Sequence, residues 1–390
     1  MSNRPPIQMF FTQKFNDTAV YLDNAASSPL LEDLRNQLSD IWAYAYINPS
    51  SGHKHGQLLK RELDSAKAQF LDTLQFNDAE LIWTSGGTES NNIAIKGLNC
   101  KKILSTKIDH PSIIKSVEDV AADCVFVNVL ANGQLDLVDL EQKLDNTVDL
   151  LTVGLVNGET GNIQNLLDIR RLLDSKAPNC HFHVDAVQAL TKTPIPWNEA
   201  KIDLCSFSAH KVHGPGAVGA LVFRPSLEID PLFSGGGQQN NIRSGSFDPA
   251  GILAFSYAVQ SLMGNDQFIA NARELNAALR ERLADLKDSQ GAPLKLVMIS
   301  EPSASPFILA FSLPGFQAAV LMRILGESGV MISAGSACSA GSKAPSASLT
   351  AMGYSAEVAF GTLRASFGIQ NSHADIERFI DALQAAVLAY

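Results

Sequence analysis

The stretch DLCSFSAHKVHGPGAVGALVF, residues 203–223, contains two apolar runs separated by a loop that carries Lys211. DLCSFS and GALVF are typical of buried strands, and the Gly-Pro-Gly at 214–216 indicates a turn before the second one. Lysine is almost never fully buried without a partner. A desolvated lysine close to another cation loses its proton and becomes a nucleophilic amine that can form a Schiff base. The stretch therefore predicts two core strands with a candidate nucleophile between them.

Similar short apolar runs alternate with helical patterns before this stretch. They are LIWTS (81–85), KKILST (101–106), CVFVNV (124–129), LLTVGLV (150–156) and HFHVDA (181–186). Runs this uniformly apolar suit strands covered on both faces, as in a mostly parallel sheet flanked by helices. We therefore expect an α/β fold whose large domain spans residues 20–260.

The pattern changes after residue 264. Apolar residues three and four apart, from Phe268 to Leu286, predict a long helix, which is followed by strands near LKLVMIS and FILAFSL. Ser372 and Asp375 form a capping signal for a last amphipathic helix. We assign residues 1–19 and 261–390 to a smaller α/β domain.

Composition excludes several classes of function. With 390 residues, 46% hydrophobic and 18% charged, the chain is long enough for two domains around a large core. Its formal charge of -10 argues against direct binding to nucleic acid or to an anionic membrane. The five cysteines are scattered without a CxxC pair, which argues against a disulfide framework or a structural zinc site and fits a reducing cytoplasm. Residues 1–16 lack a signal-peptide core, and no apolar run approaches the roughly 18 residues of a membrane span. We expect a cytoplasmic protein with no metal site and no membrane contact.

Polar candidates follow three of the predicted strands, where open α/β sheets bind their ligands. TSGGTESNN (84–92) would direct backbone N–H groups at a phosphate, although a tight strand-to-helix turn explains it equally well. His110 precedes Pro111, and a histidine there is more often a helix-end residue than a catalyst. Asp185 ends a buried strand, and Gln188 follows three residues later. If Asp185 had only a structural role, its charge would be paired with an arginine of the fold. Together with Lys211, the ordered set describes a pyridoxal-phosphate site.

A last candidate lies in SAGSACSAGSKAPSAS, residues 333–348, where Cys338 stands among serine, alanine and glycine. Too few apolar side chains surround this thiol to build a core, so the segment is predicted to be a mobile surface loop. The cysteine either has no function there or is a nucleophile that the mobile loop carries to its target.

The ordered segments resemble the motifs of the cysteine desulfurases, pyridoxal-phosphate enzymes of the class V aminotransferase group. The segments are YLDNAASSPL, NPSSGHKHG, TSGGTESNNIAIKG, HVDAVQ, SFSAHKVHGPGAVGAL, GGGQQNNIRSG, SAGSACSAGS and TLRASFG, which span nearly the whole chain. The resemblance implies the fold type I architecture, with a seven-stranded sheet in the large domain, and a homodimer. It also implies removal of sulfur from L-cysteine to leave L-alanine and a persulfide on Cys338. The extended cysteine loop implies delivery of that sulfur to an acceptor protein, as in the assembly of iron–sulfur clusters or other thio-cofactors.

The same resemblance gives individual residues their expected roles. Lys211 would bind the cofactor covalently and move the substrate proton, Asp185 would hold the pyridine nitrogen, and Gln188 would contact the ring oxygen. His110 would stack on the ring and assist proton transfer, and Arg364 would pair with the substrate carboxylate. The phosphate would be held by Gly87, Thr88, Ser208 and His210, with Ser246 reaching it from the neighbouring subunit in place of the usual threonine. The thiol would be activated by His110 or by the substrate amine, with Lys343 as a weaker candidate.

One position departs from the family pattern. Gly158, in VNGETGNIQ, stands where an asparagine usually contacts the ring oxygen, so that contact is absent or is made by Asn157 or water. Two other functions remain open. An aminotransferase, or a lyase acting on another amino acid such as selenocysteine, would keep Lys211 and Asp185 without needing a thiol at 338. A non-catalytic binding protein on the same scaffold would have lost Lys211, so its presence counts against that reading.

Overall fold

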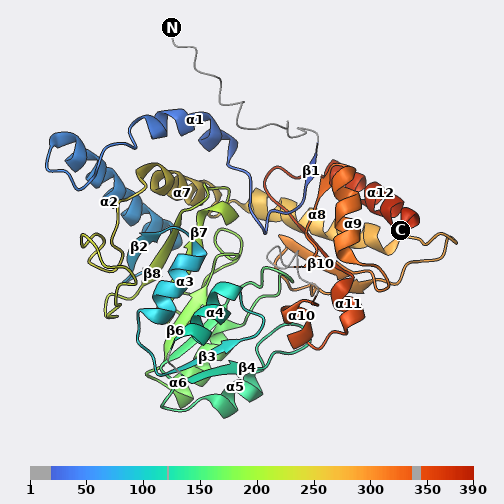
Figure 1. Ribbon diagram of the computed structural model, residues 1–390, viewed down its shortest axis with the longest axis horizontal. Coiled ribbons are helices and arrows are strands. Elements are labelled where there is room, and N and C mark those ends of the chain that lie inside the picture. Colours follow the sequence, from blue (N-terminus) through green and yellow to red (C-terminus); the bar gives the residue numbers. More distant parts are fainter. Residues whose placement is uncertain (1–18, 121–122, 336–343) are drawn as a thin grey trace, which may run out of the picture.

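A computed structural model describes residues 19–120, 123–335 and 344–390. The largest element is a seven-stranded sheet in the order β2-β8-β7-β6-β5-β3-β4 (Figure 1). Its strands are β2 (Glu80–Thr84), β3 (Lys102–Thr106), β4 (Asp123–Val127), β5 (Leu150–Gly154), β6 (His181–Asp185), β7 (Leu204–Ser208) and β8 (Gly219–Phe223). Five of them, β3 to β7, pair in parallel, and β8 runs antiparallel to both of its neighbours. The expected α/β fold with a mostly parallel sheet is confirmed.

Helices cover both faces of this sheet because its strands are apolar on both faces. In β2, Trp83 points to the face where Phe70 and Phe255 pack against it, while Ile82 packs on the opposite face with Ile93. The covering helices are α1 (Glu32–Ala43), α2 (Lys54–Leu74), α3 (Gly87–Lys96), α4 (Pro111–Asp119), α5 (Leu137–Lys143), α6 (Leu166–Lys176) and α7 (Pro249–Leu262). Helix α2 packs on α7, and α3 packs on α4 (Figure 1). The alternation of side chains along each strand thus builds two apolar layers.

A second core lies around a three-stranded antiparallel sheet in the order β12-β10-β9. Its strands are β9 (Val297–Met298), β10 (Ile308–Ser312) and β12 (Thr362–Ser366). The helices of this part are α8 (Asp266–Ala284), α9 (Ala318–Glu327), α10 (Ala347–Ala351), α11 (Ala356–Phe360) and α12 (His373–Ala389). Helix α12 begins with the predicted capping box of Ser372 and Asp375. The predicted long helix after residue 264 is α8, whose Leu275, Leu279 and Leu283 are buried in this core.

The start of the described chain contributes to the second core and not to the large sheet. Strand β1 (Val20–Tyr21) pairs in parallel with β11 (Val330–Met331), and Val20 and Leu22 are fully buried there. The division into domains at residues 20 and 260 stays a prediction. Residues 20–22 therefore pack against the C-terminal part of the chain, and the strands of the large sheet come later in the sequence.

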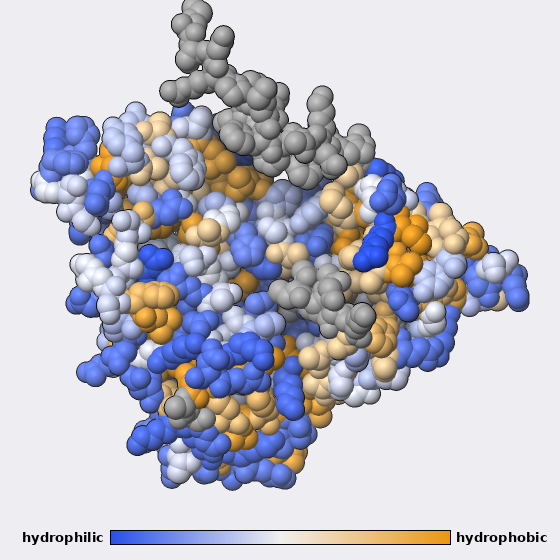
Figure 2. Space-filling model, viewed as in Figure 1, coloured by the Kyte–Doolittle hydropathy of each residue, from blue (hydrophilic) through white to orange (hydrophobic). Residues whose placement is uncertain are grey.

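The surface facing the viewer in Figure 2 is largely polar over the seven-stranded sheet, with apolar residues gathered around α9. There Val320 and Met331 are partly exposed. Within the described ranges, none of the helices is both long and apolar enough to cross a membrane.

Candidate active site

The carboxyl ends of the parallel strands bring most of the predicted site residues to one edge of the large sheet. Gly87 follows β2, His110 follows β3, and Gly158 follows β5. Asp185 ends β6, and Lys211 lies in a short 3-10 turn, η2 (Ala209–Lys211), directly after β7. Parallel strands end at the same edge, so loops distant in sequence meet there, as in other open α/β sheets.

Asp185 is held by neutral donors. Asn91 Nδ2 donates to its Oδ2 at 2.7 Å, and the backbone N–H of Val187 donates to its Oδ1 at 3.0 Å. The side chain is 8% exposed, and no basic residue of the described chain forms an ion pair with it. The arginine partner that a purely structural role would require is therefore absent from the described residues. A negative charge is left directed at the open end of the sheet.

Lys211 reaches back to the start of the described chain. Its ammonium donates to the carbonyl oxygens of Ala25 and Ala26, at 2.6 and 2.8 Å. Gln188 Nε2 donates to the same Ala25 oxygen at 2.9 Å, so the two side chains converge on one point. A second lysine, which is buried, lies beside it, because Lys192 Nζ donates to the Lys211 carbonyl at 2.8 Å. Burial, with Lys211 acting in the same direction, lowers the pKa of Lys192 to about 7.

The glycine pair after β2 forms a cradle at the start of α3. Gly86 has a φ of 144°, which favours glycine, and a Cβ on Gly87 would lie 2.7 Å from Val187 Cγ2. No side chain of the described residues caps this helix start, so its first backbone N–H groups have no capping acceptor there. Ser208 lies beside the pair, and its Oγ is 3.0 Å from His210 Nδ1. Burial is the main cause that lowers the pKa of His210 to about 4, with Lys211 and Lys192 adding to it. Donors at a helix N-terminus suit an anion such as phosphate.

His110 is the N-cap of α4 and lies at the mouth of this site. Its Nδ1 accepts the backbone N–H of Ser112 at 3.1 Å. Desolvation lowers its pKa, Asp185 opposes this shift and Lys211 adds to it. Hydrogen bonds through Ser112 and Asn91 connect His110 to Asp185. His110 therefore caps α4, as the sequence favours, and it also lies in the candidate site.

Asn157 and Gly158 differ in what they can offer a ligand. The Asn157 side-chain oxygen accepts from the N–H groups of Glu159 and Thr160, and its amide donates to the Ile108 carbonyl. This side chain is therefore largely committed to closing its own turn. A Cβ on Gly158 would lie 3.3 Å from Gln188 Nε2, and Gln188 Oε1 is buried without a partner among the described residues. Gln188, and not Asn157, has an acceptor left for a ligand.

Arg364 lies in β12 with its side chain buried. Its Nη2 forms an ion pair with Asp23 Oδ1 at 2.6 Å and donates to Ser333 Oγ at 2.9 Å, while Nη1 donates to the Gly158 carbonyl at 2.8 Å. Ser333 Oγ also donates to Asp23 at 2.8 Å. Arg364 Nε is buried without a partner within the described part of the chain. The guanidinium is thus fixed in place, and an internal carboxylate already occupies one of its nitrogens.

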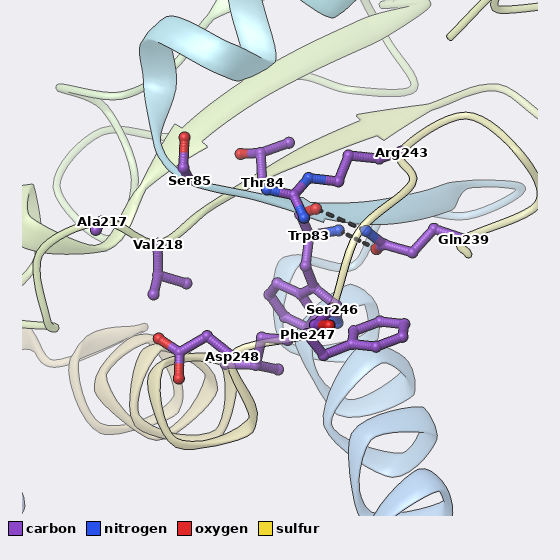
Figure 3. Close-up of a pocket in the computed structure, with 11 residues that line it drawn as sticks. Trp83, Thr84, Ser85, Ala217, Val218, Gln239, Arg243, Ser246, Phe247 and Asp248 are labelled. Carbon is purple, nitrogen blue, oxygen red and sulfur yellow. Dashed lines mark hydrogen bonds between the residues drawn. The ribbon is translucent and has the colours of Figure 1, made fainter. Parts of the chain in front are cut away.

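Ser246 lines a pocket of about 70 Å³ with Thr84, Ser85 and Arg243 (Figure 3). Thr84 and Ser85 directly precede the glycine pair. The Gln239 side chain bonds to both backbone groups of Trp83 in this pocket, at 2.6 and 2.9 Å (Figure 3). Arg243 pairs with Glu89 of α3 at 2.8 Å. The contact of Ser246 with the phosphate site of a neighbouring subunit stays a prediction.

Cys338 and Lys343 lie outside the described residues. The structure describes the residues on either side of this segment, and Glu159 lies beside Gly335 before it and beside Ser346 after it. A Cβ on Gly335 would be 3.2 Å from Glu159 Oε1, and Ser346 and Ser348 neighbour the same carboxyl group. Burial raises the pKa of Glu159, and these serines and Arg364 oppose the shift. The loop that carries the predicted nucleophile therefore starts and ends beside the Arg364 region.

Several site residues have no counterpart among the sequence predictions. They are Asp23, Asn91, Ser112, Glu159, Lys192 and Ser333. Asp23, Asn91 and Lys192 stand close to motif residues, in YLDNAASSPL, in TSGGTESNN and after HVDAVQ. That proximity is the signal that could have found them. Ser333 begins the quoted SAGSACSAGSKAPSAS and Glu159 lies in VNGETGNIQ, whereas none of the motifs quoted above contains Ser112.

Comparisons with known proteins agree with this geometry. The family model described as aminotransferase class-V matches residues 20–379. The cysteine desulfurase IscS of Dictyoglomus turgidum is 31% identical over 381 residues, which are 94% of each chain. A solved NifS-like protein superposes with a TM-score of 0.86 at 26% identity, covering 94% of this chain and 98% of its own. A structure titled "SspA in complex with cysteine" superposes with a TM-score of 0.76 at 28% identity, covering 89% and 98%.

These matches run through both cores and include every motif that the site assembles. The fold is that of the NifS-like fold type I enzymes. The chain belongs to the class V aminotransferases, among the pyridoxal-phosphate-dependent cysteine desulfurases.

Proposed function

We propose that this protein is a cysteine desulfurase that binds pyridoxal phosphate and converts L-cysteine to L-alanine, with a persulfide on Cys338. The observation that carries the proposal is the convergence of Lys211 and Gln188 on the Ala25 carbonyl, at the edge where Asp185 ends β6. The relatives named cysteine desulfurase, and the neighbour titled as a complex with cysteine, support the choice of substrate.

The residues present fit pyridoxal phosphate on three counts. The Asp185 carboxylate, which forms no ion pair with the described residues, suits a protonated ring nitrogen. Gln188 Nε2 donates one hydrogen to the Ala25 carbonyl, and its second hydrogen suits the ring oxygen. The Gly86-Gly87 turn, with Thr88, Ser208 and His210 around it, suits the phosphate. Lys211 would hold the cofactor covalently. Once bound, the cofactor would supply an electron-withdrawing ring that stabilises negative charge at the substrate Cα.

The other steps belong to side chains of this chain. Arg364 orients the substrate carboxylate, and Lys211 removes the Cα proton. The Cys338 thiolate bonds to the substrate sulfur as the carbon–sulfur bond breaks. The electron pair of that bond goes to the carbon, which takes up a proton to give alanine. Sulfur leaves the enzyme when an acceptor protein takes it from Cys338, as in the assembly of iron–sulfur clusters or other thio-cofactors.

A homodimer would complete the site. Ser246 lines a pocket with Ser85 and Arg243. In keeping with the resemblance to the family, we propose that it reaches the phosphate of a second copy. Large aromatic side chains at the end of α1 support such an interface, because Trp42, Tyr44 and Tyr46 are 61%, 67% and 84% exposed. The compartment we propose is the reducing cytoplasm, which suits a reactive thiol.

The test compares purified wild type with Cys338→Ser, each loaded with pyridoxal phosphate and given L-cysteine. Wild type should form alanine and gain one reducible sulfur atom on the Cys338 peptide, seen by mass spectrometry. The serine variant should bind the cofactor normally and form at least about a hundredfold less alanine, because a hydroxyl is a far poorer attacker of sulfur.

Lys211→Ala serves as the matched control, since it should lose both the cofactor's visible absorption and the sulfur transfer. Full alanine production by Cys338→Ser, with no sulfur on that peptide in wild type, would refute the proposal. Formation of a keto acid in place of alanine would identify an aminotransferase.

A further inference from the structure

Asp185 and His110 are joined by a chain of hydrogen bonds through two residues that have no assigned role. Asn91 lies in α3 and is 1% exposed, and Ser112 lies in the first turn of α4 and is 8% exposed. Asn91 Nδ2 is 2.7 Å from Asp185 Oδ2 and 2.8 Å from Ser112 Oγ. Ser112 Oγ is in turn 2.7 Å from His110 Nδ1. Each of these distances is that of a well-formed hydrogen bond.

The chemistry of the groups fixes the direction of the chain. A carboxylate only accepts hydrogen bonds, so the Asn91 atom that faces Asp185 must be the amide nitrogen. The second hydrogen of that nitrogen is donated to Ser112 Oγ. The hydroxyl proton of Ser112 is then directed to His110 Nδ1, which also accepts the Ser112 backbone N–H at 3.1 Å. Because a backbone N–H cannot accept, Nδ1 must present its lone pair.

We propose that Asn91 and Ser112 are positioning residues that transmit the orientation set by Asp185 to His110 and hold its neutral imidazole with the proton on Nε2. The His110 side chain is exposed at the mouth of the site, and its Nε2 makes no hydrogen bond to the described residues. Neutral His110 therefore presents a proton donor at its outer edge. Adding a proton to Nδ1 would set donor against donor, so the neutral ring is favoured over the imidazolium.

The tautomer decides what His110 can do in the reaction, and this consequence rests on the proposed function. An imidazole with its proton on Nε2 donates to a substrate atom, but it cannot take a thiol proton at that nitrogen. His110 is therefore removed from the groups that could generate the Cys338 thiolate. The substrate amine becomes the leading candidate for that step.

The test is NMR of the full chain labelled with nitrogen-15 histidine, in the cofactor-free and the loaded protein. His110→Gln identifies the His110 signals among the eight histidines. Wild type should show a protonated Nε2 and an unprotonated Nδ1. Ser112→Ala and Asn91→Leu should each lower the ratio of the Nε2–H to the Nδ1–H tautomer about fivefold, as expected for the loss of one net hydrogen bond.

Two matched controls lie in the same helices. Ser116→Ala removes another buried hydroxyl from α4, and Asn92→Leu removes the neighbouring amide, which bonds to the Thr88 carbonyl at 2.9 Å. Both should leave the His110 tautomer unchanged. With cysteine as substrate, Ser112→Ala should lower kcat more than it raises KM, while Ser116→Ala should change neither.

A wild-type His110 with its proton on Nδ1 would overturn the inference. So would a wild-type tautomer ratio in both Ser112→Ala and Asn91→Leu, since the backbone cap alone would then set the ring. If Asn91→Leu does not fold, Ser112→Ala carries the test. The NMR measurement needs no substrate, so it separates a wrong tautomer from a wrong assignment of the reaction.

Discussion

The two ends of the candidate site handle buried charge in opposite ways. At the cofactor end, Asp185 is held by the neutral donors Asn91 and Val187, with no basic partner among the described residues. At the carboxylate end, Arg364 forms an ion pair with Asp23 at 2.6 Å. Leaving a buried charge without a counterion is costly. The first end is therefore completed only by a cationic ligand, whereas the second already contains an anion where the substrate carboxylate is expected.

The largest effect should come from removing the charge at the cofactor end. Asp185→Asn keeps the shape and an acceptor for Asn91, but it can no longer stabilise a positive ring nitrogen. We expect kcat for alanine formation to fall about a thousandfold, within the range seen when an essential acid–base function is lost. Asp203→Asn is the control, because Asp203 accepts from the Phe182 backbone at the other end of the sheet. Normal turnover by Asp185→Asn would mean that the charge is structural.

The next effect is the pH dependence of stability that Asp109 contributes near the cofactor end. Asp109 accepts from the backbone of Thr106 and Gly154, and burial raises its pKa from 3.8 to about 6. The folded state therefore holds this proton to higher pH than the unfolded state does, so the stability contributed by Asp109 falls as pH rises from about 4 to about 6. The loss should reach about 3 kcal/mol at most.

The measurement is urea unfolding of wild type and Asp109→Asn from pH 4 to pH 7, since other titrating groups cancel in the difference. Wild type should lose stability relative to the variant over this interval. A constant difference would show that Asp109 ionises with an ordinary pKa.

At the carboxylate end, Arg364→Ala should raise KM for cysteine by about 10- to 100-fold, the value of a lost hydrogen bond to a charged group. The cofactor absorption should stay nearly intact, because on that side Arg364 contacts only the backbone carbonyl of Gly158. Asp23→Asn tests the competing anion. It keeps an acceptor for Arg364 and removes the charge, so KM should fall by up to about tenfold. An unchanged KM in Arg364→Ala would move the carboxylate site elsewhere.

The smallest effect is expected where the two ends meet, at Gly158. Its carbonyl accepts from Arg364, and its Cα faces Gln188. In Gly158→Ala the new Cβ would lie 3.3 Å from Gln188 Nε2, so the flexible end of that side chain must shift by a few tenths of an ångström. Steady-state kinetics should change by less than about threefold. A larger loss of activity would show that Gln188 cannot move without losing its ligand contact.

The cofactor end was predictable from the sequence because its residues stand directly after apolar strands. A motif such as TSGGTESNN carries its own backbone geometry, and parallel strands deliver such motifs to one edge whatever the length of the intervening chain. Lys211, Asp185 and the glycine pair could therefore be named with the fold. Ser246 shows the limit of such reasoning, since its motif was recognisable but the contact predicted for it needs a second copy of the chain.

The sequence by itself determined the fold class, the family and the chemistry-bearing residues of the sheet edge, because alternating apolar runs and short motifs are local properties of the chain. Only the tertiary structure decided the partners of those residues. Asp23 meets Arg364 across 341 positions, and Asn91 meets Asp185 across 94. Such contacts depend on how β1 lies against the second core and how α3 packs on β6, and neither is encoded in a short stretch. Packing, and not local pattern, therefore set the charge balance that distinguishes the two ends of the site.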